Sequence, residues 1–135
     1  MASTFSTRLK IELIGSGEQS NSWGNTTNNN LSQSLEQSIA GVYTKNLGAS
    51  SSPYVLTTNN GPQTQANNEA RQAAIVFTGH ASDLSVQFPA VEKLYFLRNA
   101  SSSNKITARL GGSGNTFVIN PGRNVFISTD GTNWY

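Results

Sequence analysis

The chain has 135 residues, a formal net charge of +2 and no cysteine, which fits one modest domain and excludes a disulfide framework and a thiolate metal site. Its nine Lys and Arg residues are scattered singly and no apolar run is long enough to span a membrane, so we expect a soluble protein with no secretory signal, no nucleic-acid partner and no membrane insertion. Ser, Thr, Asn and Gln supply 54 residues against 30 for Leu, Ile, Val and Phe, so the core is thin and self-association is expected to bury further apolar surface.

The first segment with a clear pattern runs from Phe5 to Leu13. Phe5, Leu9, Ile11 and Leu13 are apolar at odd positions, and charged residues alternate with them from Arg8 onward. Alternation of this kind is typical of a half-buried β-strand. We therefore predict a strand whose residues Phe5, Leu9 and Ile11 dock on a partner surface.

A helix is predicted between Asn30 and Gly41, with Asn30 as its N-terminal cap and Gly41 as its stop. Apolar residues four positions apart share one face of this helix, namely Leu31, Leu35 and Ile39. So short a helix is marginal by itself, because helix nucleation is costly, and its apolar face must pack on something. We assign these residues, together with the preceding Trp23, to a subunit contact.

The rest of the chain has the pattern of successive short strands, with a helical turn near 69–73. The candidate strands are 42–44, 54–57, 74–78, 84–88, 93–98, 105–110, 116–119 and 125–129. From residue 74 onward their connections have hairpin or short-loop length, so we predict a mainly β fold, an antiparallel β-sandwich or meander with one short helix in the N-terminal half. A single domain over 1–135 is expected, in which 1–41 is the docking and oligomerisation segment and 42–135 the β-body.

Turn residues and two aromatic residues mark the end of the chain. In the pairs Pro121-Gly122 and Asp130-Gly131, glycine supplies the positive φ that short β connections need. Trp134 and Tyr135 follow, and we assign them to docking against the domain, a sister subunit or a partner, because a terminus frays unless something holds it. Stacking on a host surface glycan is the alternative role for these rings.

Candidate catalytic and metal-binding residues are too few or too dispersed to form a site. His80 is the single histidine and lies in a predicted turn, and the seven carboxylates lack the spacing of a general acid and base. One histidine without cysteine does not indicate a zinc site. Gly111-Gly112-Ser113-Gly114 lacks the lysine of a phosphate-binding loop. We therefore expect no metal, no cofactor and no enzymatic activity.

Several segments taken in order carry a family resemblance: Thr4–Leu9, Trp23–Leu31, Leu35–Gly41, Pro89–Phe96 and the ending Asp130-Gly131-Thr132-Asn133-Trp134. Over nearly its whole length the chain resembles a family of tailed-phage virion proteins, described as tail-fibre or structural proteins of aquatic phages. The ending is similar to that of a fibre-base module. Longer relatives continue from it into further fibre, whereas this chain stops at Tyr135.

The resemblance implies a non-enzymatic, β-rich building block of a virion. A trimer that docks on other virion proteins is expected, as a tail-fibre adaptor or short appendage assembled in the bacterial cytoplasm. A capsid decoration protein and a glycan-binding receptor-recognition module remain the alternatives.

Overall fold

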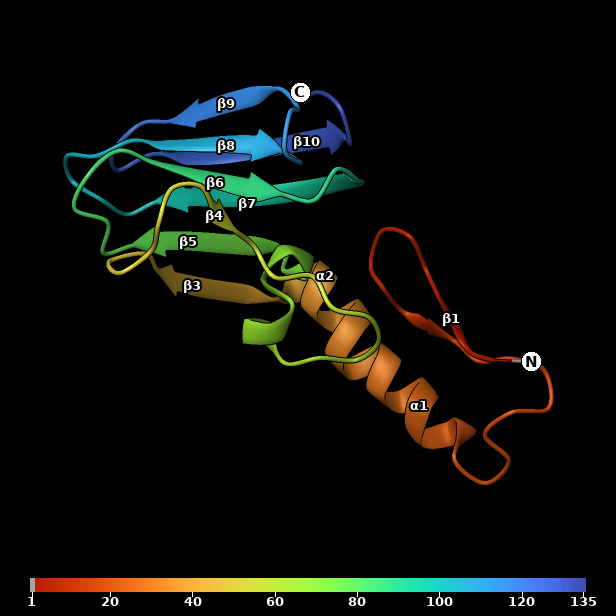
Figure 1. Ribbon diagram of the computed structural model, residues 1–135. Coiled ribbons are helices and arrows are strands. Elements are labelled where there is room, and N and C mark those ends of the chain that lie inside the picture. Colours follow the sequence, from red (N-terminus) through yellow and green to blue (C-terminus); the bar gives the residue numbers. More distant parts are fainter. Residues whose placement is uncertain (1) are drawn as a thin grey trace.

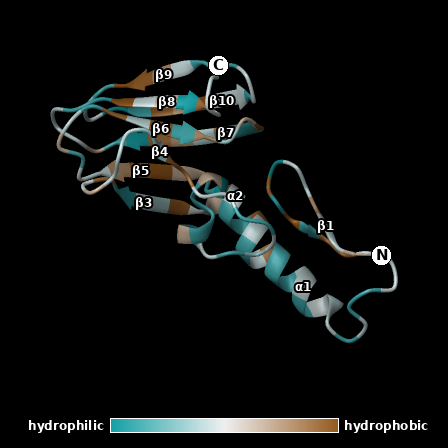
Figure 2. Cartoon of the chain, in the orientation of Figure 1, coloured by the Kyte–Doolittle hydropathy of each residue, from teal (hydrophilic) through white to brown (hydrophobic). Residues whose placement is uncertain are grey.

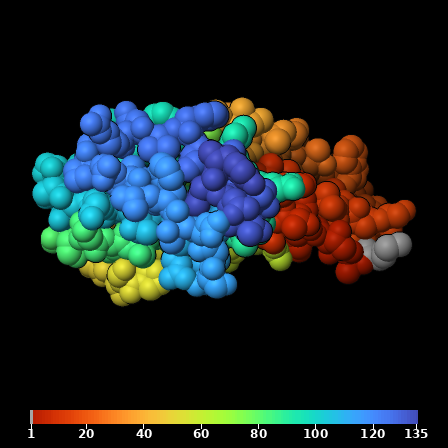
Figure 3. Space-filling view, turned by 90° about the horizontal axis from the view of Figure 1, so that it is seen from above, coloured from red at the N-terminus to blue at the C-terminus, as the bar shows by residue number. Residues whose placement is uncertain are grey.

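The computed structural model describes residues 2–135, in which a two-layered β-body carries a projecting N-terminal segment (Figure 1). Seen from above, this segment extends from one side of the body (Figure 3). Hydrophobic residues are concentrated in the strands, and hydrophilic residues predominate along the helix (Figure 2). The prediction of a mainly β fold with one helix in the N-terminal half is confirmed.

Two four-stranded sheets form the body. The first sheet has the order β10 (Asn124–Asp130), β7 (Glu92–Asn99), β5 (Ala74–Thr78) and β3 (Val42–Asn46). The second sheet has the order β4 (Tyr54–Val55), β6 (Leu84–Phe88), β8 (Ile106–Leu110) and β9 (Thr116–Ile119). These bounds agree closely with the strands predicted from the sequence.

The strands run in directions that the sequence did not indicate. From β3 to β8 successive strands alternate between the two sheets, so each returns to its own sheet pointing the same way. As a result β3, β5 and β7 are parallel, and so are β4, β6 and β8. In the body, β9 against β8 and β10 against β7 are the antiparallel pairs. The sandwich is confirmed, but the antiparallel prediction was wrong for most pairs, because the connections from β3 to β8 cross between layers instead of forming hairpins.

The core lies between the two sheets and is made by alternate residues of each strand. Aromatic rings meet edge to face at its centre, with Phe88 5.1 Å from Tyr95 and 6.3 Å from Phe77 between ring centroids. The fully buried apolar residues around them include Ile75, Val86, Leu97, Ile106, Ala108 and Ile119. This core belongs to the β-body, so the N-terminal segment is held by other contacts.

The chain begins with a hairpin and not with the single strand predicted for this region. β1 (Thr4–Phe5) pairs antiparallel with β2 (Glu12–Leu13). Between them the Ser6 carbonyl accepts the Lys10 N–H at 3.1 Å, and Lys10 has a φ of 56°, a left-handed value. The prediction failed because alternation of apolar and charged residues does not reveal a turn made without glycine.

The helix is continuous through three segments, α1 (Trp23–Asn29), the π-helical η1 (Asn30–Leu35) and α2 (Glu36–Ala40). It ends at Gly41 as predicted, but it begins well before the predicted cap. Asn30 lies inside the helix, where its side chain binds the hairpin by accepting the Glu12 N–H at 3.1 Å and donating to the Glu12 carbonyl at 2.8 Å. Its polar side chain therefore serves tertiary packing and not capping.

Two short 3₁₀ turns, η2 (Gln65–Asn67) and η3 (Glu69–Arg71), lie near the predicted helical turn. All three residues of η3 are buried. A buried charged residue must be hydrogen-bonded or paired. The partners of Glu69 and Arg71 therefore show which parts of the chain η3 holds together.

Arg71 joins the N-terminal segment to the body. Its Nε donates to the Leu9 carbonyl of the hairpin at 2.9 Å, and Nη1 donates to the Gln33 carbonyl of the helix at 3.3 Å. Nη2 donates to the carbonyls of Gly61 at 2.8 Å and Asn59 at 3.4 Å. Burial lowers the pKa of this guanidinium to about 10, which leaves it charged at neutral pH.

Glu69 faces the other way and holds β3 and β4. Its carboxylate lies 2.9 Å from Lys45 Nζ, accepts the Tyr54 hydroxyl at 2.8 Å and accepts the Thr57 N–H at 3.1 Å. Burial opposes the charge on Lys45, but hydrogen bonds to Tyr54 and Glu69 outweigh it and raise the pKa of the ammonium group. One short turn thus secures both the first strands of the body and the segment that precedes them.

Candidate functional site

The helix packs on the rest of the chain with a polar face. Asn30 and Ser34 are its buried residues, and Gln37 donates from Nε2 to the Gln63 carbonyl at 3.0 Å. An amphipathic helix of a globular protein normally turns its apolar face inward. This helix does the reverse: its buried residues are polar, and Leu31, Leu35 and Ile39 stay exposed.

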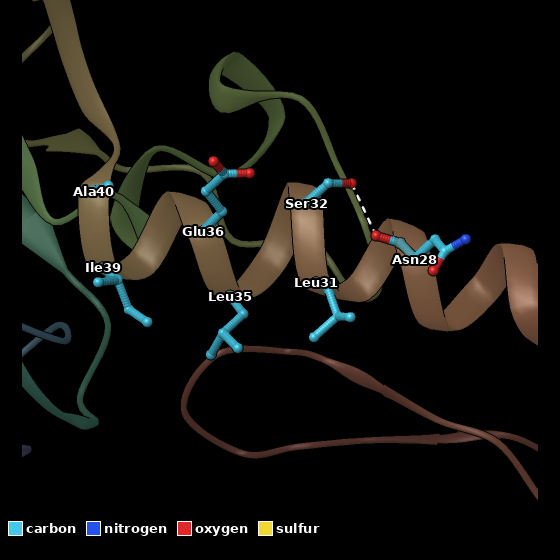
Figure 4. Close-up of a pocket in the computed structure, with 7 residues that line it drawn as sticks. All are labelled: Asn28, Leu31, Ser32, Leu35, Glu36, Ile39 and Ala40. Atoms are coloured by element: carbon cyan, nitrogen blue, oxygen red, sulfur yellow. Dashed lines mark hydrogen bonds between the residues drawn. The ribbon is translucent and has the colours of Figure 1, made fainter.

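Leu31, Leu35 and Ile39, the apolar row, point to one side of the helix, away from Ser32 and Glu36 (Figure 4). Their exposed fractions are 52%, 37% and 71%. A shallow groove of about 400 Å³ runs along the helix beside the row. The structure therefore brings these three predicted residues together on one exposed surface.

The π-helical part keeps the row straight. In an α-helix, with 3.6 residues per turn, residues four apart drift gradually around the axis. A π turn closes its hydrogen bonds over five residues instead of four, so it contains more residues per turn. Across Asn30–Leu35 this offsets the drift and brings Leu31 and Leu35 closer to the same side of the helix. Trp23, which is 61% exposed, lies at the start of the same helix.

A second apolar surface lies on the outer face of the first sheet, where sequence reasoning did not place one. Val42, Leu94, Phe96 and Phe126 are exposed there, Phe126 at 72%. With Ile39 they line a hollow of about 510 Å³ between the helix end and the sheet. The sequence does carry a signal of this surface, the unbroken apolar run 94–97. A strand with one face in water normally alternates apolar and polar residues, so an unbroken run indicates that both faces are apolar.

The predicted docking residues of the N-terminal hairpin are not part of this surface. Phe5 is exposed, whereas Leu9 and Ile11 are half-buried. The backbone of this hairpin is held by the buried guanidinium of Arg71, through the Leu9 carbonyl. Neither groove nor hollow is lined by any of these three residues.

The two terminal aromatic residues are placed differently from each other. The Trp134 ring lies edge to face against Phe88, with 5.3 Å between centroids, so it packs on the chain's own core. Tyr135 is exposed, and its backbone exchanges hydrogen bonds of 2.9 and 3.1 Å with Ser128. Its hydroxyl donates to Asp130 at 2.9 Å. Gly122 and Gly131 have the predicted positive φ, of 70° and 94°.

Acid is expected to loosen this C-terminal loop between about pH 4 and pH 2. The N–H groups of Asn133 and Thr132 and the Tyr135 hydroxyl donate to the Asp130 carboxylate and lower its pKa to about 2. A lowered pKa stabilises the folded loop above the ordinary value of about 4, and that contribution is lost as the pH falls toward the folded value. Fluorescence of Trp134 in a Trp23→Phe background measures the change. Asp130→Asn should remove the transition, and an unchanged transition in that variant would assign it to another group.

His80 and Asn104 join two loops of the β-body. His80 is buried, with Nε2 3.3 Å from the Asn104 carbonyl, and Asn104 donates to the His80 carbonyl at 3.1 Å. Over the described chain, no three His, Cys, Asp or Glu side chains are grouped so as to hold a metal ion. Within residues 2–135, no helix is long and apolar enough to cross a membrane.

The apolar row and the hollow form one exposed apolar surface. They are contiguous, because Ile39 belongs to both. The chain matches no protein-family model, no curated protein and no solved structure.

Proposed function

We propose that this chain is a non-enzymatic structural protein that assembles into a homo-oligomer, expected to be a trimer, as a building block of a phage virion. The observation that carries the proposal is the reversed helix. Its polar face is buried against the chain, while Leu31, Leu35 and Ile39 face outward. A second copy that covers this row removes it from water, at about 25 cal/mol for each Å² of apolar area.

The size of the apolar surface supports assembly. The exposed parts of the row and of the sheet residues beside it add up to an apolar surface on the order of 800 Å², where one whole aromatic side chain accounts for about 150–250 Å². The largest apolar patch of an ordinary monomer covers roughly 300–600 Å². A standard interface takes about 800 Å² from each partner, so this surface is large enough for a specific contact.

The charge of this surface favours a second copy as the partner. Glu36 is the one charged residue among those that line the groove or the hollow. A strongly charged surface repels an identical one, whereas a neutral apolar surface does not. The thin core inferred from composition agrees, because further apolar burial must then come from association.

Leu35→Asp is expected to convert the oligomer into a folded monomer. Leu35 is partly exposed, on the side of the helix opposite Ser32 and Glu36 (Figure 4), so an aspartate there still reaches water in the monomer but places a charge in the contact. Native mass spectrometry of wild type and variant, compared with the monomer mass of 14.4 kDa, measures the effect. Asn29→Asp is the matched control, because it adds the same charge at an exposed helix position that lines neither groove nor hollow. A monomeric wild type, or an oligomer unaffected by Leu35→Asp, would contradict the proposal.

The virion setting rests on the sequence resemblance and has its own test. Purified virions labelled with a gold-tagged antibody against this chain should carry gold at the tail for a fibre adaptor or short appendage. Gold over the head would instead favour the decoration alternative. Virions without label, although the epitope is accessible, would contradict the virion assignment and leave the assembly proposal in place.

A further inference from the structure

We infer that Asn60 is a site of spontaneous modification: it loses ammonia to become aspartate or isoaspartate, and the isoaspartate product releases the N-terminal hairpin. Asn60 is the one asparagine of the chain that is followed by glycine. Glycine carries no side chain to hinder the attack of its own nitrogen on the preceding side-chain amide, so this dipeptide is the favoured place for the reaction. The inference concerns the hairpin and does not depend on the proposed function.

The reaction needs only water and the backbone. Solvent base removes the proton of the Gly61 N–H, and this nitrogen attacks the side-chain carbonyl carbon of Asn60. The side-chain nitrogen takes a proton from water and leaves as ammonia, and a five-membered imide remains. Water then opens the imide at either of its two carbonyls, giving aspartate or isoaspartate. Both products carry a negative charge that asparagine lacks, and isoaspartate has one more carbon atom in the main chain.

The two reacting groups are placed differently in the structure. Asn60 is exposed, so its side chain reaches solvent. Gly61 is buried against the hairpin, where its N–H donates to the Lys10 carbonyl at 2.7 Å. A Cβ placed on Gly61 would lie 3.4 Å from the Phe5 ring. The amide that is attacked thus faces water, while the attacking nitrogen is held by the hairpin.

Docking of the hairpin and the reaction therefore exclude each other at the Gly61 nitrogen. A buried N–H that is engaged in a hydrogen bond is not accessible to solvent base, so the reaction takes place when the hairpin opens transiently. The imide nitrogen carries no hydrogen, and the Lys10 carbonyl then has lost its donor.

Hydrolysis of the imide to isoaspartate keeps the hairpin released. The N–H returns, but the longer main chain displaces it from the Lys10 carbonyl. The next group along the chain is displaced as well, because the Gly61 carbonyl accepts Arg71 Nη2 at 2.8 Å. Since Arg71 also holds the Leu9 carbonyl of the hairpin, both attachments at this loop are weakened by one chemical change.

The rate of ammonia loss tests the dependence on docking. Native wild type, Arg71→Met and wild type unfolded in guanidinium chloride are kept at mildly alkaline pH, and fragment-ion mass spectrometry follows the change of asparagine to aspartate at position 60. We expect a measurable rate in the native protein and a rate about tenfold higher in Arg71→Met, because one hydrogen bond to a charged group contributes about a factor of ten. The unfolded chain should react fastest.

Asn30→Ala makes this test independent of Arg71. It removes the two hydrogen bonds between Asn30 and Glu12 of the hairpin without changing the loop that contains Asn60, so it should also raise the rate. Circular dichroism shows whether each variant keeps its β-body. Equal rates in the native wild type, the two folded variants and the unfolded chain would overturn the inference. Reaction confined to the unfolded chain, or no reaction at Asn60 in any sample, would overturn it as well.

Trypsin cleavage after Arg8 and Lys10 tests the release. Wild type that has aged and contains isoaspartate at position 60, separated by chromatography, should be cleaved several times faster than fresh protein. Asn60→Gln is the matched control, because it keeps an amide whose longer side chain would have to close a less favourable six-membered ring. Aged and fresh Asn60→Gln should therefore be cleaved alike. Isoaspartate at position 60 with unchanged cleavage of the hairpin would overturn the inference.

Discussion

Replacing Arg71 with Met is expected to release the N-terminal hairpin while the β-body stays folded. The guanidinium donates to four carbonyls, one in the hairpin, one in the helix and two in the loop before η2. Hydrogen bonds to a charged group contribute about 1.5–3 kcal/mol each, and the loss of several is partly offset by hydration of the freed carbonyls. We therefore expect the free energy of unfolding to fall by about 3 kcal/mol.

Limited trypsin digestion measures the release directly. The hairpin carries Arg8 and Lys10, which are cleavage sites, and their cleavage should become much faster in Arg71→Met. Arg123→Met is the control, because Arg123 is exposed and an exposed substitution changes stability by at most about 0.5 kcal/mol. Arg71→Lys keeps the charge but not the fork of donors, so it should give an intermediate result. Protection of the hairpin equal to that of the wild type would show that other contacts hold it.

Glu69→Gln is expected to reduce the free energy of unfolding by about 2–3 kcal/mol, because the buried Glu69 loses its charge-assisted hydrogen bonds and the partly exposed Lys45 loses its carboxylate partner. Lys45 loses its carboxylate, and an amide oxygen is a weaker acceptor for Tyr54 and Thr57. These contacts hold β3 and β4, which are the first strands of each sheet. Chemical denaturation followed by circular dichroism measures the loss.

Asp83→Asn provides the matched surface control. Asp83 is 3.6 Å from Lys105, and both side chains are more than half exposed. An exposed ion pair contributes about 0–1 kcal/mol, so this exchange of carboxylate for amide should have little effect. Adding Lys45→Met to Glu69→Gln should recover part of the stability, because the uncompensated charge is then removed as well. A loss no larger than that of Asp83→Asn would mean that the Lys45–Glu69 pair does not support the fold.

These two predictions concern neighbouring residues with separate roles. Arg71 is directed to the N-terminal segment and Glu69 to the body, although both belong to η3. If the apolar row is the assembly surface, Arg71 also fixes the helix that presents it, through the Gln33 carbonyl. Any weakening of assembly by Arg71→Met would therefore be indirect. It would be accompanied by faster trypsin cleavage of the hairpin, which is not expected for Leu35→Asp.

Local features were predictable because they depend on neighbours in the chain. The bounds of β5, β6 and β9 follow from runs of β-favouring residues between turn residues, and the helix ends where Gly41 lies. The apolar row was visible as residues four apart. These signals need only the periodicity of one element and the conformational limits of individual residues.

What the tertiary structure alone decided is how those elements are joined. Nothing in a short loop tells whether it turns back in the same sheet or crosses to the other, so the parallel pairing was missed. The hairpin over 4–13 depends on a turn at Lys10 and on the distant Arg71. The reversed packing of the helix depends on polar partners far away in sequence, such as Glu12 and Gln63. The sequence by itself determined the elements and the apolar row, while long-range contacts determined that this row faces outward beside a hollow of the sheet.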